Sequence, residues 1–157
     1  MTNEASSESL GYFRVVEKRL DRDFANDSEM HEAGLAVLNY LENTPPSDSN
    51  SLTFGAIRNL IKRRSQVKLN DEQLMTITGY FVGGRIRLLD ICYHFYDDIT
   101  GQYYELSKKI MKQALAVGEL HHPLTDDVIP NFENQLIITY KPSELSNSSF
   151  MKSKERE

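Results

Sequence analysis

The chain has 157 residues, of which 39% are hydrophobic and 26% charged, so it is long and apolar enough for one globular domain with its own core. Its single cysteine, Cys92, excludes an intramolecular disulfide, and no apolar run approaches the roughly 18 residues of a membrane span. The net charge of −5 argues against general nucleic-acid binding. The first ten residues are polar, so we expect no secretory signal, no membrane partner and a cytoplasmic location.

Two amphipathic helices are predicted near the N-terminus, over residues 9–24 and 28–41. In both, apolar side chains recur at spacings of three and four residues, which places them on one face of a helix. Asp27 or Ser28 can cap the second helix, because a short side-chain oxygen accepts from the free amides of the first turn. This helical pair, 9–41, is too short to bury a core alone, so we expect it to pack on the rest of the chain.

A loop is predicted over 42–53, where two prolines stand among residues that favour turns. Thr53 can then cap a third helix over 54–65. Asn70 and Gln73 have the spacing of a capping box and predict the start of a fourth helix, which two adjacent glycines should end.

The segment 85–98 differs from the preceding ones, because its apolar residues surround a helical cylinder instead of lining one face. A helix that is apolar all round is usually buried. We therefore predict that 85–98 is the central helix of the domain. A turn at Thr100-Gly101 should lead into a further helix over 102–117, which Gly118 ends as a left-handed residue.

The pattern changes after this helix. Two short extended runs, 127–129 and 135–140, are separated by turn-forming residues, and the second run is rich in β-branched and aromatic side chains. We therefore predict a small β-hairpin over 119–141.

The predicted fold is mostly α: a single-domain helical bundle around a buried central helix, with a small C-terminal β-hairpin. The domain should cover 9–145, with its helical core over 54–118. Residues 1–8 and 146–157 are polar or charged, and we expect both ends to be disordered.

A helix, a turn, a helix and a hairpin also follow one another in a winged helix-turn-helix, which makes a DNA-binding regulator the alternative. The helix 102–117 would then enter the major groove. The side chains available to contact nucleic acid are Lys108, Lys109, Lys112 and Gln113, together with Lys141. This helix has no arginine, the residue that most often recognises guanine, which argues against the alternative.

Residues 54–68 form a compact basic patch in an otherwise acidic protein, with five cations and no acid: Arg58, Lys62, Arg63, Arg64 and Lys68. Such a cluster can be a solvated helix end whose charges complement the helix dipole. It can also be a contact surface for a phosphate or an acidic partner. We take it as the predicted partner-binding surface.

The residues that could support metal binding or catalysis are Cys92, His94, His121 and His122 with Asp97, Asp98, Asp126 and Asp127. Structural zinc sites usually show paired Cys or His ligands at two stations, and this spacing is absent. His94 and Asp98 share a face of the predicted helix, as many surface pairs do. No metal ligand, cofactor or catalytic residue is therefore assigned.

We expect a non-catalytic regulatory or adaptor protein that acts by binding another protein. The alternatives are the winged-helix DNA-binding regulator and a small enzyme or metal-binding protein that uses His94 or the pair His121 and His122.

Overall fold

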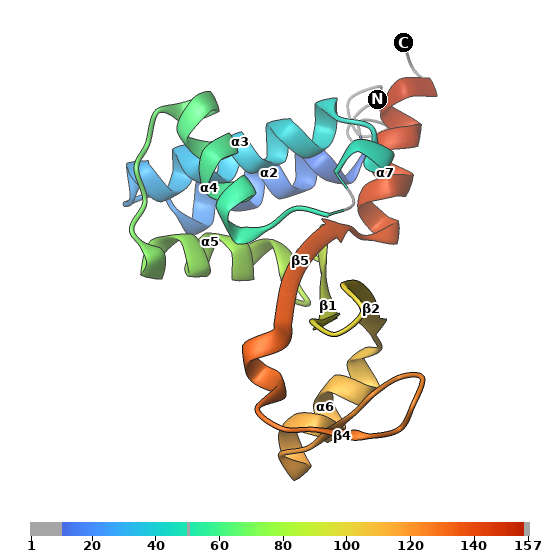
Figure 1. The fold of residues 1–157 in the computed structure, drawn as a ribbon. Helices are drawn as coiled ribbons and strands as arrows, with labels where there is room; N and C mark the ends of the chain where they lie inside the picture. The colour runs from blue at the N-terminus through green and yellow to red at the C-terminus, as the bar shows by residue number, and fades with distance from the viewer. Residues whose placement is uncertain (1–10, 50, 156–157) are drawn as a thin grey trace. The chain divides into compact units, whose positions relative to one another are not determined.

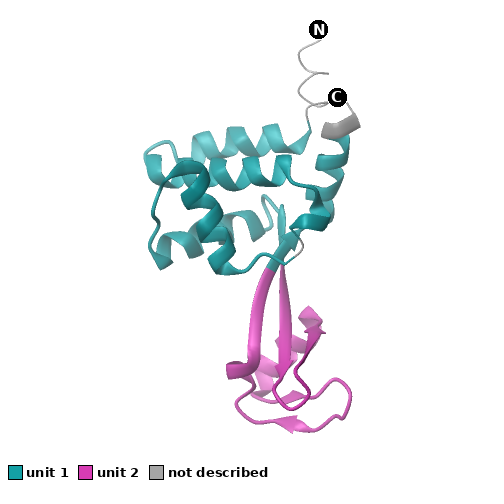
Figure 2. Cartoon of the chain, turned by 45° about the horizontal axis from the view of Figure 1, so that its top comes forward, with its two compact units in different colours: residues 1–90, 140–157 teal, residues 91–139 magenta. Residues whose placement is uncertain are grey.

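The computed structural model describes residues 11–49 and 51–155 (Figure 1). The chain divides into two compact units, whereas its sequence predicts one domain (Figure 2). Unit 1 comprises residues 1–90 and 140–157, and unit 2 comprises residues 91–139. The predicted disorder of residues 1–8 lies outside the described residues.

Unit 1 contains the four helices that local pattern predicts: α2 (Tyr12–Asp23), α3 (Ser28–Asn43), α4 (Phe54–Ser65) and α5 (Asp71–Val82). Their predicted caps are confirmed. The Asp27 side chain accepts from the Met30 amide and the Thr53 hydroxyl accepts from the Ala56 amide. Asn70 also forms its capping box, so three helix starts are encoded within a few residues each.

The predicted loop between α3 and α4 contains a short 3-10 helix, η1 (Pro46–Asp48). Side-chain hydrogen bonds then tie the helices of unit 1 together. The Tyr80 hydroxyl of α5 donates to Asp23 of α2 over 2.8 Å, and Arg14 of α2 pairs with Glu42 of α3. None of the described helices combines the length and the apolar character that crossing a membrane requires.

The predicted disorder of 146–157 is wrong for its described part, because a further helix, α7 (Glu144–Glu155), lies there. The Ser143 hydroxyl accepts from the Ser146 amide at the start of this helix. Phe150 is buried in the core of unit 1. The polar composition that suggested disorder therefore belongs to a helix that one aromatic side chain anchors to its neighbours.

The central helix predicted over 85–98 is also wrong, since most of this segment is the strand β1 (Leu89–Asp97). It pairs antiparallel with β2 (Gln102–Leu106), so the turn predicted at Thr100-Gly101 joins two strands. Continuous apolar character is shared by buried helices and by strands covered on both faces, and it does not separate them. The burial predicted for the segment is confirmed at Leu88, Leu89 and Phe95.

The helix predicted over 102–117 is therefore shorter. It is α6 (Lys108–Val117), which the Ser107 side chain caps and which ends at Gly118 with φ of 84°. The helix–turn–helix order predicted between 85 and 117 does not occur, because strands occupy 89–97 and 102–106.

The hairpin predicted from the runs 127–129 and 135–140 is wrong in its pairing. The first run contributes β4 (Val128–Ile129), which pairs with β3 (Leu120–His121). The second is β5 (Leu136–Pro142), which belongs to a three-stranded sheet of order β2-β1-β5. A 3-10 helix, η2 (Phe132–Gln135), lies between them. Most of each run is extended as predicted, but each run pairs with a different strand.

Candidate functional site

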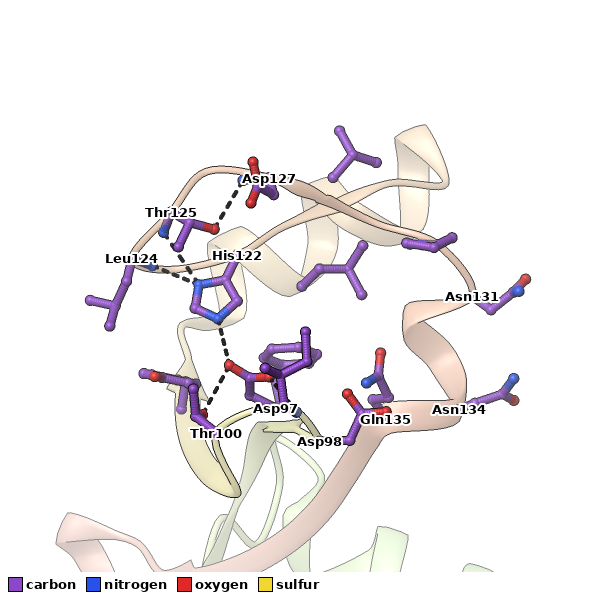
Figure 3. Close-up of a pocket in the computed structure, with 16 residues that line it drawn as sticks. Asp97, Asp98, Thr100, His122, Leu124, Thr125, Asp127, Asn131, Asn134 and Gln135 are labelled. Atoms are coloured by element: carbon purple, nitrogen blue, oxygen red, sulfur yellow. Dashed lines mark hydrogen bonds and ion pairs between the residues drawn. The ribbon is translucent and has the colours of Figure 1, made fainter.

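A pocket of about 700 Å³ lies within unit 2 (Figure 3). Its walls come from the end of β1, the β1–β2 turn, the loop between β3 and β4, and η2. These segments are far apart in the chain, so the pocket depends on what holds them in place. Two side chains, Asp97 and His122, make that connection, and Figure 3 shows them facing each other.

Asp97 organises the β1–β2 turn. Its carboxylate accepts from the Ile99 amide and from the Thr100 hydroxyl, each over 3.0 Å. The Gly101 amide donates to the Asp97 carbonyl over 2.7 Å, and Gly101 has a φ of 74°, which favours glycine. A short acidic side chain that bonds to the next residues in this way is a common means of closing a turn.

His122 organises the loop between β3 and β4. Its Nδ1 accepts from the backbone amides of Leu124 and Thr125 over 3.1 and 3.3 Å. Because Nδ1 accepts from these amides, the hydrogen of the ring lies on Nε2, which is 3.0 Å from the Asp97 Oδ2 and donates to it. One imidazole therefore joins the loop to the end of β1, with both nitrogens engaged.

Aromatic side chains enclose the same imidazole. The rings of Phe95 and Tyr104 approach it edge-on, with centroids 5.7 and 5.2 Å from the His122 ring. The His122 side chain is 13% exposed and that of Asp97 is 9% exposed. The hydrogen bond from His122 lowers the pKa of Asp97 from its usual value, against the opposing effect of burial, and the bonds from Ile99 and Thr100 act in the same direction.

The lining of the pocket combines acids, carboxamides and apolar side chains. It includes three aspartates, Asp97, Asp98 and Asp127, and among the described residues no lysine or arginine lines it. Asn131, Asn134 and Gln135 contribute three carboxamides, which Figure 3 shows along one side of the pocket. The pocket is therefore negative, with several side chains that can both donate and accept.

The predicted basic patch lies in unit 1 and is partly engaged in contacts of its own. Arg58 pairs with Asp71 of α5, and its guanidinium lies over the Phe54 ring. Arg64 donates to the Asn39 side chain over 2.6 Å and lies over Tyr40. The remaining members, Lys62, Arg63 and Lys68, are exposed, and the role of the patch in partner binding stays a prediction.

The side chains predicted to contact DNA lie on two different elements. Those of α6 are exposed: Lys108, Lys109, Lys112 and Gln113. Lys141 lies in the part of β5 that belongs to unit 1. The preceding helix of a helix-turn-helix is replaced by β1 and β2, so α6 lacks the element that normally orients a recognition helix on DNA.

The candidate ligands of a metal or a catalytic centre are dispersed. His94 contacts the Thr139 hydroxyl over 3.1 Å, and the His121 Nδ1 lies 3.1 Å from the Asp126 carbonyl oxygen. Cys92 is buried in β1. In the described part of the chain, no group of three or more His, Cys, Asp or Glu side chains could hold a metal ion. Of all these candidates, the pocket brings together only His122 and the three aspartates.

Sequence reasoning missed the carboxamides and the apolar residues at the pocket. Asn131 did carry a local signal in the sequence, because it stands in a turn-forming run. In the structure its φ is 54°, in the left-handed region that asparagine adopts more readily than most residues. Nothing in the local pattern relates Asp97 to His122, which are 25 residues apart and meet only in the folded unit.

Comparison of the chain with protein-family models, with curated proteins and with solved structures finds no match.

Proposed function

We propose that this chain is a non-catalytic adaptor or regulatory protein that binds a segment of another protein in the pocket of unit 2. The observation that carries the proposal is the apolar rim of the pocket. Ile99, Leu124 and Val128 line it and are 92%, 73% and 51% exposed. Large apolar side chains grouped around a cavity are typical of binding surfaces, whereas scattered ones are ordinary.

The carboxamides favour a peptide as the occupant. No side-chain hydrogen bond to a described residue engages Asn131, Asn134 or Gln135, so their donors and acceptors are free to bind a ligand. An extended peptide backbone presents the complementary groups at every residue. The apolar rim would then receive the side chains of that peptide.

The state of His122 favours binding over chemistry. A general base needs a nitrogen that can take up a proton from a substrate or a nucleophile. In His122 one nitrogen donates to Asp97 and the other accepts from two backbone amides. This arrangement supports a structural role for His122, which joins the loop between β3 and β4 to the end of β1 in the wall of a binding pocket.

The test is selection of 12-residue peptides from a display library on the intact chain, followed by fluorescence anisotropy with the enriched peptides. The variant Ile99→Ser/Leu124→Ser removes two rim side chains that are already exposed, so its fold should be unaffected. We expect this variant to bind the peptides about tenfold more weakly, because apolar contact area is lost.

The matched control is Leu115→Ser/Val117→Ser, which removes two exposed apolar side chains of α6 in the same unit. Leu115 and Val117 do not line the pocket. The control should bind like the original chain. Equal affinity of both variants, or a library that yields no binding peptide, would refute the proposal.

A further inference from the structure

We infer that the segment bound in this pocket carries a basic side chain, arginine or lysine, that enters between Asp98 and Asp127. The inference rests on the proposed function and adds the chemical class of the partner.

The charge of unit 2 is strongly uneven. Residues 91–139 contain seven acids and three lysines, and all three lysines lie on α6. Three of the acids line the pocket, and no described lysine or arginine does. A cavity with one sign of charge and apolar walls concentrates ligands of the opposite sign.

The three aspartates of the pocket differ in their partners. Asp97 is held by His122, Ile99 and Thr100 and serves the fold. Asp98 and Asp127 are exposed, and no ion pair within the described residues engages either of them. Figure 3 shows them on different elements, with Asp127 in the loop before β4 and Asp98 in the β1–β2 turn below it. Two unpaired carboxylates on separate walls are suited to a cation that enters between them.

The apolar part of the lining fits the stem of such a side chain. Lysine and arginine carry a chain of methylene groups that packs on apolar surface while the charged end reaches polar partners. Leu124 and Ile99 provide that surface at the rim. Tyr104, which also lines the pocket, adds an aromatic ring that attracts a cation. An acidic or uncharged segment would leave both carboxylates without a partner.

The test uses three small probes of nearly equal shape and different charge: benzamidine, which is cationic at neutral pH, uncharged benzamide and anionic benzoate. Each is titrated into the intact chain labelled with nitrogen-15, and the amide signals of Thr100, Leu124 and Asn134 are followed. We expect benzamidine to shift these signals and to bind at least about threefold more tightly than benzamide, since one nearby charge contributes about that factor. Benzoate should bind most weakly.

The variant Asp98→Asn/Asp127→Asn should remove the preference for benzamidine. Its matched control, Glu105→Gln/Glu133→Gln, neutralises two exposed acids of unit 2 that do not line the pocket and should retain the preference. The preference should also shrink in about 0.5 M salt, because salt screens exposed charges. Equal binding of benzamidine and benzamide, no shift with benzamidine, or an unchanged preference in the Asp98/Asp127 variant overturns the inference.

A second readout separates failure of the inference from failure of the proposed function. Each arginine of a selected peptide is replaced by citrulline, which keeps the shape of the side chain and removes its charge. Loss of affinity supports the inference. Unchanged affinity, with binding that still depends on Ile99 and Leu124, overturns the inference and leaves the proposed function standing.

Discussion

Asp97 accepts hydrogen bonds from His122, Ile99 and Thr100, and these contacts join two walls of the pocket. An ionised carboxylate accepts such bonds best, and for this reason the folded state lowers the pKa of Asp97 from its usual 3.8. Its contribution to stability is therefore fully present above about pH 4 and is lost as the pH falls through the lowered pKa.

We expect Asp97→Asn to lower the free energy of unfolding at neutral pH, and we expect the difference from the original chain to narrow below about pH 4. Urea unfolding of both proteins between about pH 6 and about pH 2.5 measures this difference. Asp23, whose pKa the hydrogen bond from Tyr80 lowers, titrates in both proteins and cancels in the comparison. A difference that stays constant with pH would show that the Asp97 charge does not stabilise the fold.

Gly34 and Gly79 differ in the space that surrounds an added Cβ, so substituting alanine at each position tests the packing of unit 1. A Cβ added at Gly34 of α3 would lie 2.6 Å from the Leu20 Cδ2, and Leu20 is fully buried. We expect Gly34→Ala to destabilise unit 1 by about 1 kcal/mol, since the free-energy cost of overpacking against Leu20 exceeds the free energy gained from the higher helix propensity of alanine. Gly79 of α5 has no atom within 4 Å of an added Cβ, so Gly79→Ala should stabilise by about 0.5–1 kcal/mol. Urea unfolding measures the free energy of unfolding of each variant. A change of the same sign in both variants would contradict this packing.

At the scale of elements, α7 shows how a polar segment becomes a helix. It has four serines and an asparagine, which favour caps and turns over helix interiors. The contact that local composition does not reveal is Phe150, which is 8% exposed and packs in the core of unit 1. Burial of one large aromatic side chain stabilises a helix of weak intrinsic propensity.

Phe150→Ala should therefore destabilise the protein by about 3 kcal/mol, through lost burial and the cavity that it leaves. The neighbouring Met151 is 58% exposed, and Met151→Ala should change the free energy of unfolding by less than about 0.5 kcal/mol. Thermal or urea unfolding of Phe150→Ala and Met151→Ala measures both changes in the free energy of unfolding. Similar values for both would mean that α7 does not depend on Phe150.

The strands β1 and β2 illustrate a second limit of local pattern. Residues 89–97 are apolar and aromatic enough for a buried helix or a buried strand, and period alone does not separate the two. The strand is established by its partner, with Tyr93 opposite Leu106 and Asp97 opposite Gln102. Cross-strand pairs of this kind stabilise a sheet as pairs four residues apart stabilise a helix.

At the scale of the whole molecule, the chain has two cores of unequal size. The larger is in unit 1. The smaller, in unit 2, consists of six buried residues among those described: Phe95, Leu106, Met111, Ala114, Leu120 and Phe132. Because a smaller core buries less apolar surface, we expect unit 2 to open at lower free energy than unit 1.

Phe95→Ala should reduce the protection of amides in β2 and α6 from hydrogen exchange, because Phe95 is 2% exposed and belongs to the smaller core. Amides of α3 in unit 1 should keep their protection. Hydrogen exchange followed by mass spectrometry under native conditions measures both. An equal loss of protection in α3 would mean that the two units open together.

The sequence alone determined the features that depend on neighbours a few residues away. The caps at Asp27, Thr53 and Asn70 and the helix end at Gly118 each need hydrogen bonds within four residues, so their pattern is complete in a short window. No short stretch of the sequence determines the predicted function as a binding protein, which stays a proposal.

Tertiary structure decided the rest: the strand at 89–97, the helix α7, the division into two units and the pocket. Each depends on a partner that is distant in the chain, as when His122 meets Asp97. The free energy of such contacts comes from burial and from hydrogen bonds that exist only after folding, and for this reason no local pattern contains them.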